Sequence, residues 1–454
     1  MKSILNSLSL SQIAFIIIVL FCFLFGYSFV NWGDYNSPFH HDVDQYYFYI
    51  ITFFKHHDIT FSHGTYGFWY TETPLHKLVP KTTYGMSLFY LPFFLIADLF
   101  SKSNATGYEP IYAWSIHIGC VLYVLIGLAY CRKILLYWFS EKIIAIVLLI
   151  IFFGSNLFCY TLINSELAHS VLFFLISTFI YHVVKWHISK KINSYLVFCF
   201  VLGLITIIRP TEICIGIFPL LIGIITLSSF KEKWERFVDL KYWFFIGIIL
   251  FFIPLFPQLL YWKLQSGQWL FFSYGSSEGF FWTEPKLFNV LFSYRKGWLV
   301  YSPLMALSLF GFVQLFKKNK ELFWGVLIYF VINLYLISAW WDWAFGGSFG
   351  MRALVQVYAT LIIPSAYSIQ WMNENVKQIW KKSLVFASIM FCILLNIFQS
   401  NLYKHGIISY DGMTKEAYWF TFLKKDYSKD DLLHLETLVK HPNYDAMKQG
   451  KRDE

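Results

Sequence analysis

Charged residues are scarce in this chain of 454 residues: they make up 14% of the sequence, whereas hydrophobic residues make up 57%. Soluble globular domains carry about 25% charged residues, so the composition excludes an ordinary soluble domain. Instead, the sequence holds repeated uncharged apolar runs of about 18 residues or more, the length that an α-helix needs to cross a bilayer. We therefore predict an all-α polytopic membrane protein.

The sequence also lacks any Cys-x-x-Cys pair, and its seven cysteines all lie in or beside apolar segments. This pattern excludes a disulfide framework and the common zinc motifs, and we expect the thiols to be small buried side chains. The net charge of +9 does not indicate a nucleic-acid partner. Many of the basic residues lie in short loops between apolar runs, as on the cytoplasmic side of a membrane protein.

No small-residue cleavage site follows the first apolar run, so we expect that run to be a retained helix and not a signal peptide. No internal repeat is evident either, although many transporters are built from repeated halves. Twelve segments are predicted to be helices: 11–30, 86–99, 111–131, 143–158, 170–187, 193–208, 213–229, 242–262, 298–316, 321–339, 353–370 and 383–400.

The loops between these segments fall into two alternating sets. Loops rich in Lys and Arg are predicted to face the cytoplasm; they are 132–142, 185–191, 231–241, 317–320 and 377–382. The other set is predicted to face outward: 31–85, 159–169, 209–212, 263–297, 340–352 and the tail from 401.

With the N-terminus inside, an odd number of crossings must separate the outer loop 31–85 from the basic loop at 132, yet two helices, 86–99 and 111–131, lie between them. The segment 86–99, only about 14 residues long, is therefore expected to be re-entrant or packed at the surface; the alternative is that both helices cross and a neighbouring segment is assigned wrongly. We predict about 11–12 membrane helices in one domain over residues 1–400, with long outer loops at 31–85 and 263–297. Residues 401–454 are predicted to form a small extracytoplasmic C-terminal segment.

The first outer loop contains a dense polar and aromatic stretch, FHHDVDQYYFY, at residues 39–49. On a helix, Asp42 and Tyr46 would share a face because they are four residues apart, whereas Asp44 would point elsewhere. An aspartate at a lipid–water boundary can have its pKa raised by desolvation, which suits a general base. The alternative is an interfacial aromatic belt with solvated acids.

The outer stretch NSELAHS places Glu166 and His169 three apart at the predicted start of a helix, so both could face one cavity and hold substrate. Alternatively, Glu166 only complements the helix N-terminus. A divalent metal has enough candidate ligands, but their spacing matches no compact motif and no metal is required. The candidate ligands are His40, His41, Asp42, Asp44, Glu166 and His169.

Several cations stand at predicted outer helix ends. Arg209, in IIRPTE, precedes Pro210, which fixes where the guanidinium emerges; it could bind a lipid phosphate or simply snorkel. Arg295 and Lys296 form an adjacent pair that suits an anionic head group or anchors a helix end. Glu278 lies in the same outer loop among aromatic residues, a composition that suits a sugar.

A glycine pair, an aspartate and an arginine share the last outer loop, AWWDWAFGGSFGMRAL. Gly346 and Gly347 permit turns and close approach to a ligand. Asp342 lies between two tryptophans, and Arg352 opens the next helix. Tryptophans alone at this position are typical of interfacial anchors, but the combination indicates a binding site.

With these segments in order, the chain resembles the GT-C class of integral-membrane glycosyltransferases, in the bacterial branch related to protein O-mannosyltransferases and aminoarabinose transferases of lipid A. The likeness covers about residues 10–400. It rests on the acids just past the first helix and on the stretches TTYGMSLFYLPFFLIADLF, NSELAHSVLFFL, IIRPTE, NVLFSYRKGWLVYSP and WWDWAFGGSFGMRAL.

The resemblance implies a polyprenyl-phosphate sugar donor in the bacterial inner membrane and transfer to a glycan, lipid or protein acceptor on the extracytoplasmic face. Many relatives carry Asp-Glu where this chain has Asp42-Val43-Asp44, so either aspartate could be the base; the spacing to Tyr46 favours Asp42. Arg209, and with it Arg295 or Arg352, would hold the leaving phosphate. Two other interpretations remain: a polysaccharide polymerase or ligase, and a transporter or flippase of lipid-linked sugar.

Overall fold

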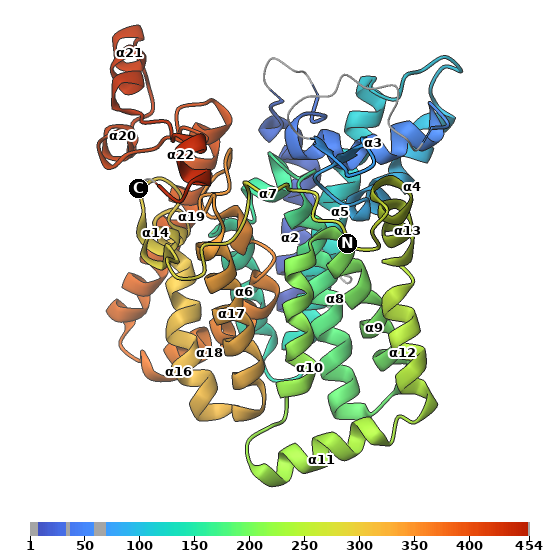
Figure 1. The fold of residues 1–454 in the computed structure, drawn as a ribbon. Helices are drawn as coiled ribbons and strands as arrows, with labels where there is room; N and C mark the ends of the chain where they lie inside the picture. Colours follow the sequence, from blue (N-terminus) through green and yellow to red (C-terminus); the bar gives the residue numbers. More distant parts are fainter. Residues whose placement is uncertain (1–7, 33–36, 59–69, 453–454) are drawn as a thin grey trace. The chain divides into compact units, whose positions relative to one another are not determined.

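The computed structural model describes residues 8–32, 37–58 and 70–452, and the regular secondary structure of these residues is almost all helix (Figure 1). One small sheet lies within the described ranges: β1 Tyr70–Glu72 pairs antiparallel with β2 Leu78–Pro80. By length and composition, five described helices could cross a membrane, or six if the bent pair α12 Tyr242–Phe252 and α13 Phe256–Ser266 is one span. The five are Leu10–Phe29, Pro110–Leu135, Ala168–Ser189, Lys320–Ala339 and Ile379–Lys404.

The helical fold and the long apolar helices agree with the all-α membrane protein that the composition predicted. The chain forms two compact units. The first unit comprises Met1–Asn31, Leu128–Ile163 and Gly279–Glu454, and the second comprises Trp32–Gly127 and Asn164–Glu278. Each unit is described by itself.

In the first unit, α2 Leu10–Phe25 packs against α6 Glu141–Phe153, and α16 Ala306–Lys318 packs closely against α18 Tyr358–Asn375. A Cβ at Gly311 would lie 1.9 Å from the carbonyl oxygen of Pro364. The close approach of these two helices therefore depends on the missing side chain. The unit's other elements are η1 Gly26–Phe29, α7 Cys159–Leu162, α14 Leu287–Phe292, α15 Trp298–Tyr301, η4 Pro303–Met305, α17 Lys320–Ala339, η5 Arg352–Leu354 and α19 Ile379–Lys404.

The C-terminal part of the first unit carries α20 Lys415–Thr421, α21 Lys429–Leu438 and α22 Tyr444–Lys448 (Figure 1). An apolar cluster holds α20 and α21, so this part of the chain does not trail as an extended tail. The buried members of that cluster are Cys159, Ile163, Tyr301, Phe349, Leu402, Ile408, Met413, Ala417, Tyr418 and Leu435.

In the second unit, α8 Ala168–Ser189, α9 Ile192–Ile208 and α12 pack side by side (Figure 1). A Cβ at Gly203 would lie 2.2 Å from the carbonyl oxygen of Phe251, which explains the small residue between α9 and α12. Outside this group, α3 His41–Phe54 packs against α4 Gly85–Leu99. The helix α5 Pro110–Leu135 begins in this unit and ends in the first.

The predicted helix over 213–229 is wrong. The chain forms a 3-10 helix, η3 Pro210–Ile217, and one turn of α-helix, α10 Phe218–Leu221, and then turns through Gly223 at φ +84°. A new amphipathic helix, α11 Leu227–Val238, begins after Thr226, which caps it. A positive φ stops an α-helix, and a capping box starts another, so the apolar run does not continue as one helix.

Prolines divide two other predicted helices. The segment 242–262 is bent by 51° between α12 and α13, next to Pro254. The segment 298–316 begins as α15, turns at Ser302 and Pro303, and continues as α16. A proline removes one backbone donor and clashes with the preceding turn, so both breaks have a local cause.

Candidate functional site

The predicted site residues form two groups, one in each unit. The acidic cluster of the second unit comprises Asp42, Asp44 and Tyr46 of α3 together with Glu166. The cationic cluster of the first unit comprises Arg295, Lys296, Asp342 and Arg352.

The first outer loop contains a helix, α3, which was not among the twelve predicted helices but is the condition under which Asp42 and Tyr46 share a face. Asp42 and Tyr46 lie four residues apart in α3, with Tyr46 buried and Asp42 partly exposed. Asp44 accepts a hydrogen bond from the Tyr108 hydroxyl at 3.5 Å. Burial raises the pKa of the Asp44 carboxyl, an effect that the Tyr108 hydrogen bond opposes. The Asp44 carboxylate is therefore more basic than that of an aspartate in water.

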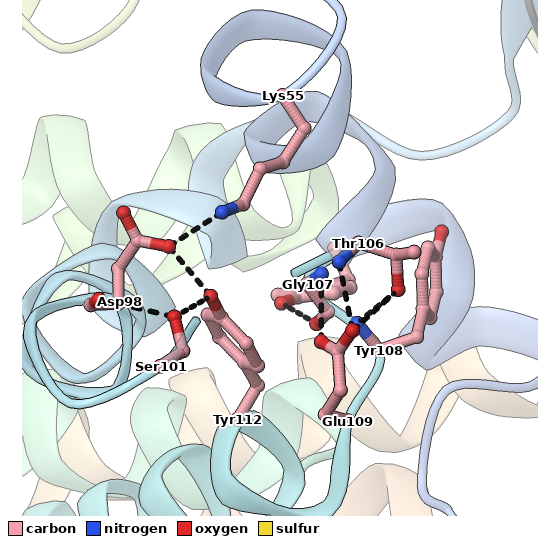
Figure 2. Close-up of polar contacts among 9 residues, drawn as sticks. Lys55, Asp98, Ser101, Thr106, Gly107, Tyr108, Glu109 and Tyr112 are labelled. Atoms are coloured by element: carbon pink, nitrogen blue, oxygen red, sulfur yellow. Dashed lines mark hydrogen bonds and ion pairs between the residues drawn. The ribbon is translucent and has the colours of Figure 1, made fainter. Parts of the chain in front are cut away.

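The loop that carries Tyr108 is itself firmly braced (Figure 2). The Glu109 carboxylate accepts the backbone N–H of Thr106 at 2.8 Å and that of Gly107 at 3.0 Å. At the end of α4, Asp98 accepts hydrogen bonds from Lys55 and from the Tyr112 hydroxyl, each at 2.5 Å. These contacts fix the loop beside α3 and so place Tyr108 opposite Asp44.

Glu166 does not occupy the position that the sequence predicted. The helix α8 begins only at Ala168, so the argument from a shared helical face with His169 does not apply, although both side chains are buried. The Glu166 carboxylate instead lies 2.8 Å from Nδ1 of His117, a buried histidine of α5. The sequence analysis missed His117, whose only signal was a histidine inside an apolar helix.

Glu166 and Asp42 are linked through His40, the residue that precedes α3. Burial and the neighbouring His41 lower the pKa of His40, while the charges of Glu166 and Asp42 act in the opposite direction. Both carboxylates thus lie within electrostatic range of one imidazole. No three His, Cys, Asp or Glu side chains among the described residues come together as a metal site.

The other predicted residues of the second unit have defined positions. Arg209 ends α9, Pro210 begins η3, and the Arg209 carbonyl accepts the N–H of Glu212 at 2.9 Å. The arginine therefore stands at a helix end, as predicted. Glu278 is buried and forms an ion pair with Lys81, Nζ to Oε1 2.5 Å, so its carboxylate is engaged with a cation before any sugar could bind.

Arg295 and Lys296 are both buried, although the sequence allowed a simple anchor at a helix end. Lys296 is 0% exposed, and its Nζ donates hydrogen bonds to the carbonyl oxygens of Ser348 and Tyr410. Burial, reinforced by the neighbouring charge of Arg295, lowers the pKa of Lys296 from 10.5 to about 7. Arg295 lies over the ring of Trp343 at 5.5 Å, and its Nε donates to the Asp411 carbonyl at 2.7 Å.

Asp342 lies in the tryptophan-rich loop and is 6% exposed. The backbone turns sharply after it, with Phe345 at φ +57° and Gly346 at φ +56°, and the N–H of Gly346 forms a hydrogen bond with the carboxylate. Burial raises the pKa of Asp342, while the charges of Arg295 and Arg352 act in the opposite direction. All four members of the cluster are therefore close enough to interact.

Nη2 of Arg295 and Oδ1 of Asp342 are among the polar atoms of this cluster that are buried without a hydrogen bond within the described part of the chain. Buried polar atoms in proteins are almost always hydrogen-bonded, so these two atoms need a partner from outside the described chain. A donor on a guanidinium and an acceptor on a carboxylate, in one small region, indicate a ligand that supplies both an acceptor and a donor.

A rigid buried network supports the loop from behind. Tyr160 receives the N–H of Phe349 at 2.9 Å, and Asn156 donates to the Phe349 carbonyl at 3.3 Å. Tyr358 donates to Oδ1 of Asn156 at 2.5 Å and accepts from Nε1 of Trp298 at 2.9 Å. The loop is therefore held by side chains from α7, α15 and α18 and by Asn156, which lies between α6 and α7.

By its fold and composition the chain falls in the class of all-α membrane proteins. No protein-family model matches the chain, and no curated protein matches it. The function is therefore argued from the chemistry of the two clusters.

Proposed function

We propose that the protein is a glycosyltransferase that moves a sugar from a polyprenyl-phosphate donor to an acceptor hydroxyl, on the extracytoplasmic face of a bacterial inner membrane. The observation that carries this proposal is the pair of unpartnered buried atoms, Arg295 Nη2 and Asp342 Oδ1. A phosphorylated sugar offers a phosphate oxygen to the guanidinium and a hydroxyl to the carboxylate, so one ligand satisfies both.

The acids of α3 supply the proton chemistry. An acceptor hydroxyl loses its proton to Asp42 or Asp44, and its oxygen forms a bond to the anomeric carbon while the bond between that carbon and the phosphate oxygen breaks. Asp42 is a candidate for the base because it lies four residues from Tyr46 in α3 and shares a helical face with it. Asp44 is a candidate because its raised pKa suits a base.

The departing polyprenyl phosphate carries the negative charge that develops in this step. Arg209 is the candidate cation for this charge in the unit that carries the acids, as the resemblance implies. In the first unit, Arg295, Lys296 and Arg352 form a positive site of their own that suits a lipid phosphate. Fixed cations in a largely dry site stabilise a developing anion without reorganising at the moment of reaction. No metal is required for this chemistry.

The proposal includes the finer topology predicted from the loops, with about 11–12 crossings. Five or six described helices meet the length of a span, and the shorter apolar helices, among them α4 and α9, would supply further crossings or re-entrant segments. The outer loops would then present the acidic and cationic clusters on the extracytoplasmic side.

The test is release of free polyprenyl phosphate when membranes containing the protein receive a sugar-loaded polyprenyl phosphate and an acceptor extract. General-base catalysis contributes roughly 10²–10⁴-fold in rate. Asp42→Asn or Asp44→Asn, whichever removes the base, should lose turnover by that order while donor still binds. Asp430→Asn, an exposed acid at the start of α21, is the matched control and should keep full turnover.

One outcome identifies the catalytic base, and another distinguishes a transferase from a flippase. Loss in only one of the aspartate variants identifies the base. Movement of the loaded lipid across the membrane with no release of polyprenyl phosphate would contradict transfer and favour a flippase.

A further inference from the structure

Two cations of the cationic cluster, Arg295 and Lys296, donate hydrogen bonds to main-chain oxygens of one short segment near the C-terminus. Lys296 Nζ donates to the carbonyl of Tyr410, and Arg295 Nε donates to the carbonyl of Asp411 at 2.7 Å. The residues joined in this way are 114 and 116 positions apart in the chain. The placement of both cations therefore depends on what holds residues 410 and 411.

The side chain of Asp411 fixes the position of this segment. It is 3% exposed, and its two carboxylate oxygens are engaged by residues further along the chain. Oδ1 lies 2.6 Å from Nδ1 of His441, and Oδ2 accepts the Tyr444 hydroxyl at 3.0 Å. Hydrogen bonds to a carboxylate are among the stronger ones in proteins, and losing them leaves a buried charge poorly satisfied.

The segment that supplies His441 and Tyr444 is fixed at its far end as well. Arg452 is buried and donates to the carbonyls of Ser338 and Trp340 at 3.0 and 3.2 Å. Closer to the cluster, the Tyr444 ring lies edge-on to Trp341 at 6.3 Å. The last residues of the described chain thus pack on the loop that carries Asp342.

We propose that Asp411, His441 and Tyr444 form a latch that positions Arg295 and Lys296, so that the C-terminal segment is a working part of the cationic cluster. The three are positioning residues. His441 and Tyr444 hold the side chain of Asp411, and the main chain at residues 410 and 411 holds the two cations that would contact the ligand. That the ligand is a lipid phosphate rests on the proposed function, whereas the latch itself does not.

The latch can be tested through Lys296 itself, because water that enters a loosened cluster restores part of the solvation that burial removed. Its pKa should then rise toward the ordinary value of 10.5. The other charged groups that act on Lys296 are Arg295, Arg352, Asp342 and Asp411, and none of these is altered in the variants below.

The experiment uses the full-length protein in lipid nanodiscs. The ¹³Cε and ¹⁵Nζ signals of isotope-labelled lysine, recorded by solid-state NMR at a series of pH values and assigned with Lys296→Arg, give the titration midpoint of Lys296. Binding of radiolabelled polyprenyl phosphate is measured on the same samples. The test variant combines His441→Ala with Tyr444→Phe. His441→Asn is the conservative variant, since its amide nitrogen can replace Nδ1 as a donor to Asp411.

The double variant should raise the Lys296 midpoint by about one pH unit or more and weaken polyprenyl phosphate binding about tenfold. His441→Asn should stay close to the wild type in both measurements. Asp431→Asn is the control, because it breaks an ion pair to Lys424 within the same C-terminal segment (2.5 Å) but contacts neither Tyr410 nor Asp411.

An unchanged Lys296 midpoint in the folded double variant would overturn the latch, and so would an equal shift in Asp431→Asn. Failure of the wild-type protein to bind polyprenyl phosphate would instead count against the proposed function. A shifted midpoint in that case would still support the latch, so the two failures are distinguishable.

Discussion

At the scale of single residues, Lys296 is the group on which pH should act most directly. Its pKa of about 7 means that the side chain is charged at pH 6 and neutral at pH 9. A polyprenyl-phosphate sugar is a phosphodiester whose single negative charge does not titrate in this range. The affinity for that donor should therefore fall as the pH rises through about 7, by roughly tenfold if a charge-assisted hydrogen bond is lost.

Donor binding between pH 6 and pH 9 measures this effect. Lys296→Arg should flatten the profile and keep tight binding at pH 9, because a guanidinium stays charged. Asp342, whose pKa is raised by burial, would titrate in the same direction, so the profile is repeated in Asp342→Asn. Constant affinity of the wild type over the whole range would contradict the assignment of Lys296 to the donor.

Local sequence could name the members of the cationic cluster but not their partners. Arg295, Lys296 and Asp342 stand out because charge is rare in the chain and gathers beside apolar segments. The carbonyl that holds Lys296 belongs to Tyr410, 114 residues away, and no spacing rule reaches that far. Asp411 could not be predicted for the same reason. His117 could not be predicted because a single histidine in an apolar helix does not indicate that it pairs with a buried glutamate, here Glu166.

At the scale of helices, the contact between α16 and α18 gives the clearest prediction of stability. Gly311→Ala would place a Cβ 1.9 Å from the backbone oxygen of Pro364, and backbone cannot move aside as a flexible side chain does. Overpacking of this kind costs about 1–3 kcal/mol, so the thermal midpoint of the purified protein should fall. Gly279→Ala is the control, because a Cβ there meets nothing within 4 Å. Equal midpoints for both variants would show that the helices separate easily.

Apolar length predicted the long helices well and their interruptions poorly. The segment predicted as 321–339 is observed as Lys320–Ala339, since an uninterrupted apolar run satisfies its own backbone as a helix. The run over 213–229 has the same composition, but Gly223 at φ +84° and the cap at Thr226 divide it. Whether a glycine continues or ends a helix depends on its neighbours in space: a Cβ at Gly223 would lie 2.3 Å from the His187 ring.

At the scale of the whole molecule, the alternation of basic loops predicts which surfaces face outward, and single cysteines can test it. Ser276 and Thr437 are exposed and belong to the predicted outer set, whereas Ser189 and Lys317 are exposed and belong to or border the basic set. Each is changed to Cys in a background in which the three partly exposed native thiols, Cys199, Cys214 and Cys392, are replaced by Ser. A membrane-impermeant maleimide is then added to intact cells.

Labelling should reach the cysteines at 276 and 437 in intact cells, and those at 189 and 317 only after permeabilisation. The physical reason is the positive-inside rule: Lys and Arg in short loops are retained on the cytoplasmic side during insertion. Labelling of all four before permeabilisation would contradict the predicted topology. The reverse pattern would place the loops that carry Glu278 and Asp411 in the cytoplasm, where transfer to an extracytoplasmic acceptor is excluded.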